Sequence, residues 1–248
     1  MNMNRHYQHL VNKLEEITHL NGVMSTIGWD QEVMLPAGAA EARAMQISAL
    51  AGVIHERMTD PQLRDCLAEL TNSGMDTFNE FERCNIREAL RSYELETKVP
   101  KRLVQELAEL GSRGHGVWVA ARQDNKFSDF APVIKRFLDL KQEWAQCVSP
   151  ELSAYDANID LFERGTTMAT ITPIFERLKQ ELIPLIHAIQ AHAVQPDTSF
   201  LQGHFARDKQ EALARQMSRD IGFDFDQGRM DVSVHPFCGG SHPTDVRI

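Results

Sequence analysis

The residues best suited to chemistry lie together near the end of the chain. His235, Cys238, His242, Asp245 and Arg247 fall within thirteen residues. Imidazole, thiolate and carboxylate groups bind metals or carry protons, and a guanidinium matches a carboxylate with two parallel hydrogen bonds. This dense set of polar side chains indicates one part of a functional site.

This stretch could form a metal site, a structural loop or a carboxylate-binding site. His235, Cys238 and His242 have the spacing of metal ligands, but a structural zinc site normally has four ligands. The simpler interpretation is a loop whose histidine and cysteine find their partners elsewhere in the fold. Arg247 together with His235 could instead bind a carboxylate.

Other catalytic signatures are absent from the sequence. His55-Glu56 is not followed by a second histidine three residues later, so no His-Glu-x-x-His zinc motif occurs. No Gly-x-Ser-x-Gly turn occurs, and the glycines at 111–116 lack both the strand and the lysine of a phosphate-binding loop. Taken from the residues alone, the chain has no complete catalytic site.

The elements that must position these residues are mostly helices. Apolar residues recur at helical spacing along most of the chain, and Asp60-Pro61 has the form of a helix start. Gly222 fits the position just past the last helix, and Pro184 should kink the helix at 170–190, the longest clear amphipathic run. The predicted helices cover residues 7–20, 37–57, 61–70, 80–95, 100–122, 128–144, 170–190 and 208–220.

Several segments interrupt this pattern. Residues 28–36 are predicted as a packed corner between helices, with the wall of a ligand groove as the alternative. The glycines within 111–116 leave three options open: a broken helix, a mobile segment, or close packing on a neighbour. Residues 155–160 are predicted as a polar connection. Apolar and polar residues alternate over 230–234, which predicts a short strand, and the glycines and prolines after it should break regular structure.

The predicted fold is therefore mostly α: a multi-helix, groove-forming array with a short β element near the C-terminal end. The 248 residues contain no repeat, no low-complexity segment and no evident linker, so we predict one helical domain over 1–248. A net charge of −9 argues against a nucleic-acid surface. We expect no membrane span and no signal peptide. The four scattered cysteines favour a reducing compartment, so the expected location is cytoplasmic.

The order of several short motifs resembles the M32 metallocarboxypeptidases, the carboxypeptidase Taq family. The final motifs carry most of the resemblance, because His-Pro-Phe and Asp-x-Arg-x-Thr occur in that family in the same order. The resemblance covers essentially the whole chain. The matching residues are Trp29-Asp30 with Met34, Pro36 and Arg43; Trp118 with Ala121-Arg122, Asp129-Phe130 and Pro132; Tyr155-Asp156, Asp160, Glu163 and Gly165; Gly222-Phe223-Asp224; Gly228-Arg229-Met230-Asp231; His235-Pro236-Phe237; and Asp245-Val246-Arg247-Ile248.

The chain also departs from the family pattern. A full-length member is roughly double this length, and its His-Glu-x-x-His helix follows shortly after Asp-x-Arg-x-Thr. This sequence ends one residue before that threonine, so the zinc ligands and the general-base glutamate are missing. The glycines at 111–116, and Arg164 where the family usually has proline, are smaller departures that put only local geometry in doubt.

The resemblance implies a zinc enzyme that removes C-terminal residues from peptides, often as a homodimer. It predicts that this chain is the N-terminal part of such a domain, with no metal or catalytic residue of its own, inactive alone and forming a homo-oligomer. It places His235, Asp245 and Arg247 in substrate binding. The alternative is a non-enzymatic helical protein that uses the same groove to bind peptides or a partner.

Overall fold

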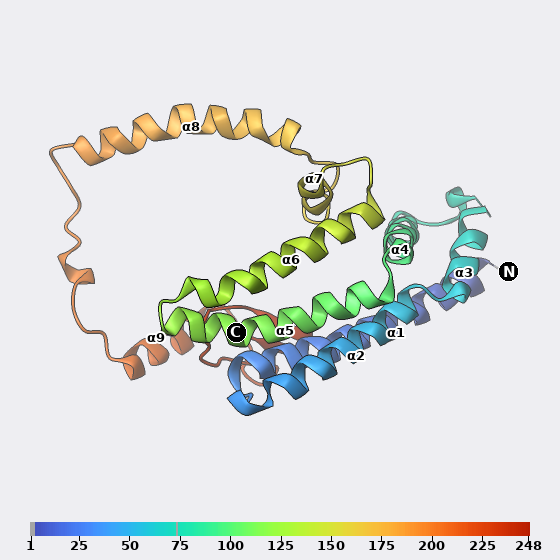
Figure 1. Cartoon of the computed structure of the whole chain (residues 1–248), viewed down its shortest axis with the longest axis horizontal. Coiled ribbons are helices and arrows are strands. Elements are labelled where there is room, and N and C mark those ends of the chain that lie inside the picture. The colour runs from blue at the N-terminus through green and yellow to red at the C-terminus, as the bar shows by residue number, and fades with distance from the viewer. Residues whose placement is uncertain (1–2, 73) are drawn as a thin grey trace. The chain divides into compact units, whose positions relative to one another are not determined.

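A computed structural model describes residues 3–72 and 74–248, and it is mostly helical (Figure 1). The helices are α1 (Met3–Val33), α2 (Ala40–Met58), α3 (Pro61–Asn72), α4 (Glu80–Lys98), α5 (Lys101–Gln123), α6 (Phe127–Val148), α7 (Ala154–Ile159), α8 (Met168–Ala191) and α9 (Arg207–Asp220). Short 3-10 turns cover Ala37–Ala39, Met75–Thr77 and Ser199–Leu201. The strands are β1 (Gly228–Arg229), β2 (Gly239–His242) and β3 (Asp245–Arg247). The prediction of a mostly α fold with a short β element near the C-terminal end is confirmed.

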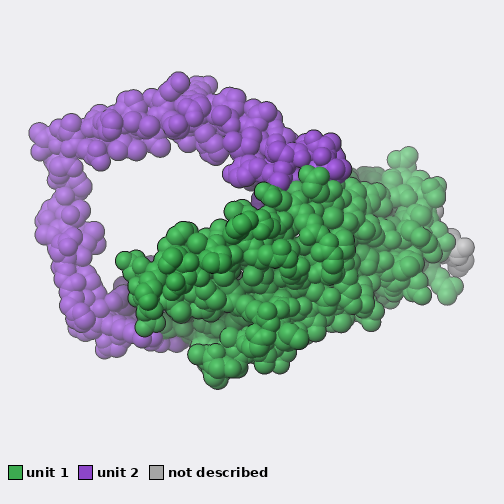
Figure 2. All heavy atoms as spheres, viewed as in Figure 1, with its two compact units in different colours: residues 1–148, 225–248 green, residues 149–224 purple. Residues whose placement is uncertain are grey.

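The chain divides into two compact units (Figure 2). The first comprises residues 1–148 and 225–248 and holds α1 to α6 with the sheet. The second comprises residues 149–224 and holds α7 to α9. Within the described residues, none of the helices combines the length and apolar character that a membrane span requires.

Two buried clusters hold the first unit together. Leu10, Leu67 and Ile86 are fully buried where α1, α3 and α4 meet. Leu103 and Leu140 are fully buried between α5 and α6. Full burial of a leucine or isoleucine stabilises a fold by roughly 1.5–3 kcal/mol, so the first cluster holds α1 in place, and the C-terminal sheet packs on α1.

Local signals define several helix starts. Asn79 begins α4 with a reciprocal capping box: its side chain accepts from the Glu82 N–H, and the Glu82 carboxylate accepts from the Asn79 N–H. The Asp60 carboxylate accepts from the Gln62 N–H at 2.9 Å, which confirms the predicted start of α3. Gly222 follows α9 with a φ of 90°, a backbone conformation that glycine adopts without strain.

The first helix is longer than predicted. It does not end at Asn21-Gly22 but runs to Val33, and the predicted corner at 28–36 is largely its last turns. Gly22 is buried beneath β2, where an added Cβ would lie 3.0 Å from the Ser241 carbonyl oxygen. The glycine is therefore explained by close packing of the sheet on α1, and not by a helix end.

The glycine-containing segment at 111–116 is continuous helix. α5 runs without interruption from Lys101 to Gln123. An added Cβ on Gly114 would lie 2.9 Å from Val133 Cγ1 of α6, whereas Gly116 has nothing within 4 Å. Close packing on a neighbour is thus the correct alternative among the three that the sequence left open.

Three further predictions were wrong. Residues 155–160 are not merely a polar connection, because α7 forms there with the Ser153 side chain as its cap. Residues 230–234 form no strand; Val232 and Val234 are exposed, so their alternation buries no face. The strands lie on either side of that segment, and the glycine pair predicted to break regular structure lies inside β2, where Gly240 allows the backbone of Asp245 to approach closely.

Candidate functional site

The candidate site is built where the sheet packs on the last turns of α1. β3 is the central strand, parallel to β1 and antiparallel to β2, and its register sets Arg247 opposite Arg229. The Ser25 hydroxyl of α1 donates to the Gly240 carbonyl oxygen at 2.9 Å, which anchors β2 on the helix. Arg43 of α2 bonds the Ile27 carbonyl at 2.8 Å and Asp30 at 2.6 Å, and so fixes the end of α1.

Both arginines of the sheet lie over one indole ring. The guanidinium carbons of Arg229 and Arg247 are 4.8 and 4.6 Å from the ring centroid of Trp29 on α1. Cations within about 6 Å of an indole are attracted by its π electrons. The parallel pairing of β1 and β3 is what brings two guanidiniums to the same indole, because partners in register project from the same face of a sheet.

Each of these arginines already forms an ion pair with an aspartate. Arg229 holds Asp231 through two contacts of 2.5 and 2.6 Å, and Arg247 lies 2.5 Å from Asp245. A hydrogen bond from the Ser241 hydroxyl and the charge of Arg247 hold the pKa of Asp245 below its usual range. The two cations over Trp29 are therefore locally neutralised.

A second indole, Trp118 of α5, gathers a different set of groups. The ring centroids of His115 and His235 lie 5.7 and 6.4 Å from that of Trp118, and the Arg122 guanidinium carbon lies 5.3 Å from it. His115 Nε2 lies 2.7 Å from the Glu32 carboxylate of α1, an ion-pair distance without the alignment of a hydrogen bond. The contact between Glu32 and His115 joins the second indole to the same end of α1.

The three residues predicted for substrate binding are divided between these clusters. Asp245 and Arg247 lie together beside Trp29, whereas His235 is exposed and lies against Trp118. His235 Nδ1 is 2.9 Å from the Pro236 carbonyl oxygen, which selects the tautomer with its proton on Nδ1.

Sequence reasoning missed Arg122, Arg229, His115 and Glu32 as members of the site. Arg122 and Arg229 stood in the motifs that carry the resemblance, and this was the only signal that could have selected them. His115 and Glu32 are separated by more than eighty residues, so no spacing rule could have paired them.

A metal does not fit the residues present. Over residues 3–72 and 74–248 no three His, Cys, Asp or Glu side chains come together as a metal-binding group. His235, Cys238 and His242 therefore do not form the ligand set that their spacing suggested. The groups at the two indoles are suited to orienting a ligand by hydrogen bonds and ring contacts.

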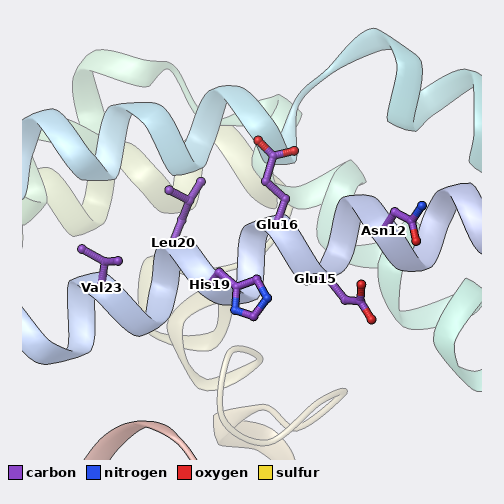
Figure 3. A pocket seen from close by; sticks show the side chains of 6 residues that line it. All are labelled: Asn12, Glu15, Glu16, His19, Leu20 and Val23. Carbon is purple, nitrogen blue, oxygen red and sulfur yellow. The ribbon is translucent and has the colours of Figure 1, made fainter.

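A cleft elsewhere on α1 has a different character. It has a volume of about 440 Å³ and is lined by side chains of a single helix (Figure 3), and one of them, Glu16, is already paired with Arg57 at 2.7 Å. Its lining residues are Asn12, Glu15, Glu16, His19, Leu20 and Val23. No second element contributes a converging group, so we place the candidate site at the two indoles.

Comparison with known proteins identifies the family. The family described as carboxypeptidase Taq (M32) metallopeptidase matches residues 9–248. The chain belongs to this M32 family. Thermostable carboxypeptidase 1 of Thermus thermophilus is 32% identical over 98% of this chain and 49% of its own length. Carboxypeptidase 1 of Bacillus subtilis is 29% identical over 95% of this chain and 47% of its own length.

Solved structures agree with the fold. The crystal structure of BsuCP matches with a TM-score of 0.93 and 28% identity, covering 98% of this chain and 49% of that one. The M32 carboxypeptidase of Deinococcus radiodurans R1 matches with a TM-score of 0.80 and 33% identity, covering 98% and 48%. The chain thus spans about half the length of the M32 relatives that it matches.

Proposed function

We propose that this chain supplies the N-terminal part of a zinc metallocarboxypeptidase that removes C-terminal residues from peptides, and that it does not hydrolyse peptides alone. The observation that carries the proposal is the M32 match over residues 9–248, combined with coverage of about half of each relative. These 248 residues contain no His-Glu-x-x-His, so they lack the ligands for zinc and the glutamate that would move protons. In this proposal residues 1–248 are one portion of a single helical domain, located in the cytoplasm.

The apolar side chains exposed on α8 support the proposal that another polypeptide covers this helix. Almost every residue of this helix is exposed, although its mean composition is apolar. A partner that covered these side chains would stabilise the assembly by about 25 cal/mol for each Å² of apolar surface removed from water. The large apolar side chains exposed along α8 are Met168, Ile174, Phe175, Leu178, Leu182, Ile183, Leu185, Ile186 and Ile189. We therefore propose that the isolated chain forms a homo-oligomer, and that the complementary half of the enzyme replaces this self-association.

Peptide binding is assigned to the two indole clusters. His235, Asp245 and Arg247 are proposed to position the peptide, with Asp245 holding the Arg247 guanidinium over Trp29. Arg247 Nε is buried and has no hydrogen-bond partner in the described part of the chain, which supports a role in which a ligand oxygen completes its contacts.

Complementation tests the enzymatic proposal. The chain is mixed with a separately made polypeptide carrying the remainder of an M32 carboxypeptidase, with and without zinc, and release of the last residue from a peptide is followed. We expect neither half to be active alone and the mixture to be active only with zinc. Hydrolysis by this chain alone would refute the proposal. Peptide binding with no hydrolysis in the mixture would favour the alternative of a non-enzymatic binding protein.

The oligomer has its own test, with a matched pair of variants on α8. Leu182→Glu places a charge within the apolar surface, whereas Gln180→Glu adds the same charge at an exposed polar position of the same helix. By light scattering we expect the wild type to be a dimer or larger, Leu182→Glu to dissociate, and Gln180→Glu to resemble the wild type. A monomeric wild-type chain would contradict the proposal.

A further inference from the structure

The candidate site contains one guanidinium that no carboxylate neutralises. Arg229 and Arg247 are paired with Asp231 and Asp245. Arg122 has no ion pair with any described residue; its contacts are the Trp118 ring at 5.3 Å and a long one, 3.5 Å, to the Val234 carbonyl oxygen. Of Arg122, Arg229 and Arg247, Arg122 is therefore the one whose charge no carboxylate of the described residues compensates.

The position of Arg122 is restrained even though it is exposed. It lies in the last turn of α5, so its backbone belongs to a regular helix. Its guanidinium lies over Trp118, and the His235 ring packs edge-on against the same indole with an interplanar angle of 65°. An arginine stacked on a ring loses less conformational entropy when it binds an anion than a freely moving side chain does.

Local charge matters here because the chain as a whole is acidic. Its net charge of −9 repels anions at long range. A carboxylate ligand must therefore be attracted by a nearby cation that is not already neutralised, and Arg122 meets that requirement at the edge of the proposed peptide site.

We propose that Arg122, held over Trp118 beside His235, binds a carboxylate of the peptide ligand. The proposal rests on the proposed peptide-binding function and adds Arg122 as the residue that binds the anionic group of the peptide. The carboxylate has two sources, the free C-terminus of a peptide or an acidic side chain next to it. A guanidinium binds either one through paired, charge-assisted hydrogen bonds.

The test measures dissociation constants by tryptophan fluorescence or calorimetry for three short peptides. The first has a free C-terminus and no acidic side chain, the second is the same peptide with a C-terminal amide, and the third is the amide with glutamate as its last residue. The proteins are the full wild-type chain, Arg122→Gln, Arg122→Lys and the control Lys135→Gln, which removes one positive charge from an exposed position on α6.

We expect Arg122→Gln to weaken binding of the free-carboxylate peptide about 10- to 100-fold, because a hydrogen bond to a charged group contributes about 1.5–3 kcal/mol. Binding of the plain amide should not change, and Lys135→Gln should resemble the wild type. Arg122→Lys should lie between wild type and Arg122→Gln, since lysine keeps the charge but loses the planar fork. A loss confined to the glutamate peptide would identify the side-chain carboxylate as the group bound.

Two outcomes would overturn the proposal, and they differ in whether the proposed peptide-binding function survives. If the wild type binds a carboxylate peptide and Arg122→Gln binds it equally well, the assignment of Arg122 fails while the peptide-binding function stands. If the wild type binds none of the three peptides, the peptide-binding function fails and the assignment of Arg122 fails with it.

Discussion

The packing of α5 on α6 can be tested with two glycines of the same helix. Gly114 and Gly116 both lie within α5, so alanine at either position gains the same helix propensity, about 1 kcal/mol. Their surroundings differ: an added Cβ at Gly114 would lie 2.9 Å from Val133 Cγ1, whereas an added Cβ at Gly116 would have no neighbour within 4 Å apart from the adjacent backbone of its own helix. The difference in stability between the two alanine variants therefore measures the contact between α5 and α6, because the gain in helix propensity is the same in both.

The magnitude follows from the contact distance. Carbon atoms pack best at about 3.5–4.0 Å, so 2.9 Å is strongly repulsive. Val133 cannot rotate away easily, because a valine in a helix has one strongly preferred side-chain conformation. Overpacking of this kind costs about 1–3 kcal/mol. Gly116→Ala should therefore stabilise the chain by up to about 1 kcal/mol, and Gly114→Ala should be neutral or destabilise it by up to about 2 kcal/mol.

The assay is urea unfolding of both variants and the wild type, followed by circular dichroism at one protein concentration. Val133→Ala and the double variant Gly114→Ala with Val133→Ala complete a mutant cycle. Removing the valine methyl groups leaves room for the new Cβ, so the double variant should be more stable than the sum of the two single changes predicts, by about 1–3 kcal/mol.

Equal stabilisation by Gly114→Ala and Gly116→Ala, together with additive behaviour in the cycle, would refute the reasoning. That result would mean that α6 does not approach α5 at Gly114, and that the glycine there serves no packing role.

Three further predictions concern α3, α4 and their contacts with the first half of α1. Leu67→Ala should destabilise the first unit by about 2–5 kcal/mol, because Leu67 is fully buried; a loss under 1 kcal/mol in urea unfolding would contradict the core assignment. Asn79→Ala removes the capping box of α4 and should cost about 1 kcal/mol, measurable as a lower midpoint of thermal unfolding; an unchanged midpoint would show that the cap is not formed. Hydrogen bonds from Lys13 and from the Gln62 N–H lower the pKa of Asp60, so the stability that they contribute is present above about pH 4, the unfolded value, and is lost as pH falls through the lower folded pKa. The difference in unfolding free energy between wild type and Lys13→Met should accordingly shrink below about pH 4; a difference that is constant from pH 7 to pH 2 would exclude this ion pair as its source.

Helix boundaries were predictable where the residues at the helix end themselves determine it, through a capping side chain or a glycine with positive φ. Asp60-Pro61 predicted the start of α3, and Gly222 predicted the end of α9, because capping and positive φ are local properties of a few residues. Asn21-Gly22 predicted an end that does not exist. Its glycine is required by contact with Ser241, more than two hundred residues away, and no local pattern contains that information.

The candidate site, too, combines local features that the sequence shows with long-range contacts that it does not show. The motif at 235–247 directed attention to the C-terminal segment, because its histidines, cysteine, aspartate and arginine are close together in the sequence. The partners of those residues could not be read from the chain. Arg247 lies over Trp29 because β3 pairs with β1 and β2 packs on α1, and His235 lies edge-on against Trp118 of α5. These are long-range contacts.

By itself the sequence determined the mostly helical fold, the amphipathic character of α8 and the M32 family, since helical periodicity and motif order are properties of neighbouring residues. Only the tertiary structure decided which charges remain available. It pairs Arg229 and Arg247 with aspartates and leaves Arg122 over an indole with no aspartate or glutamate partner in the part of the chain that the structure describes. The reason is that the register of a sheet and the packing of helices set distances between side chains that sequence separation does not encode.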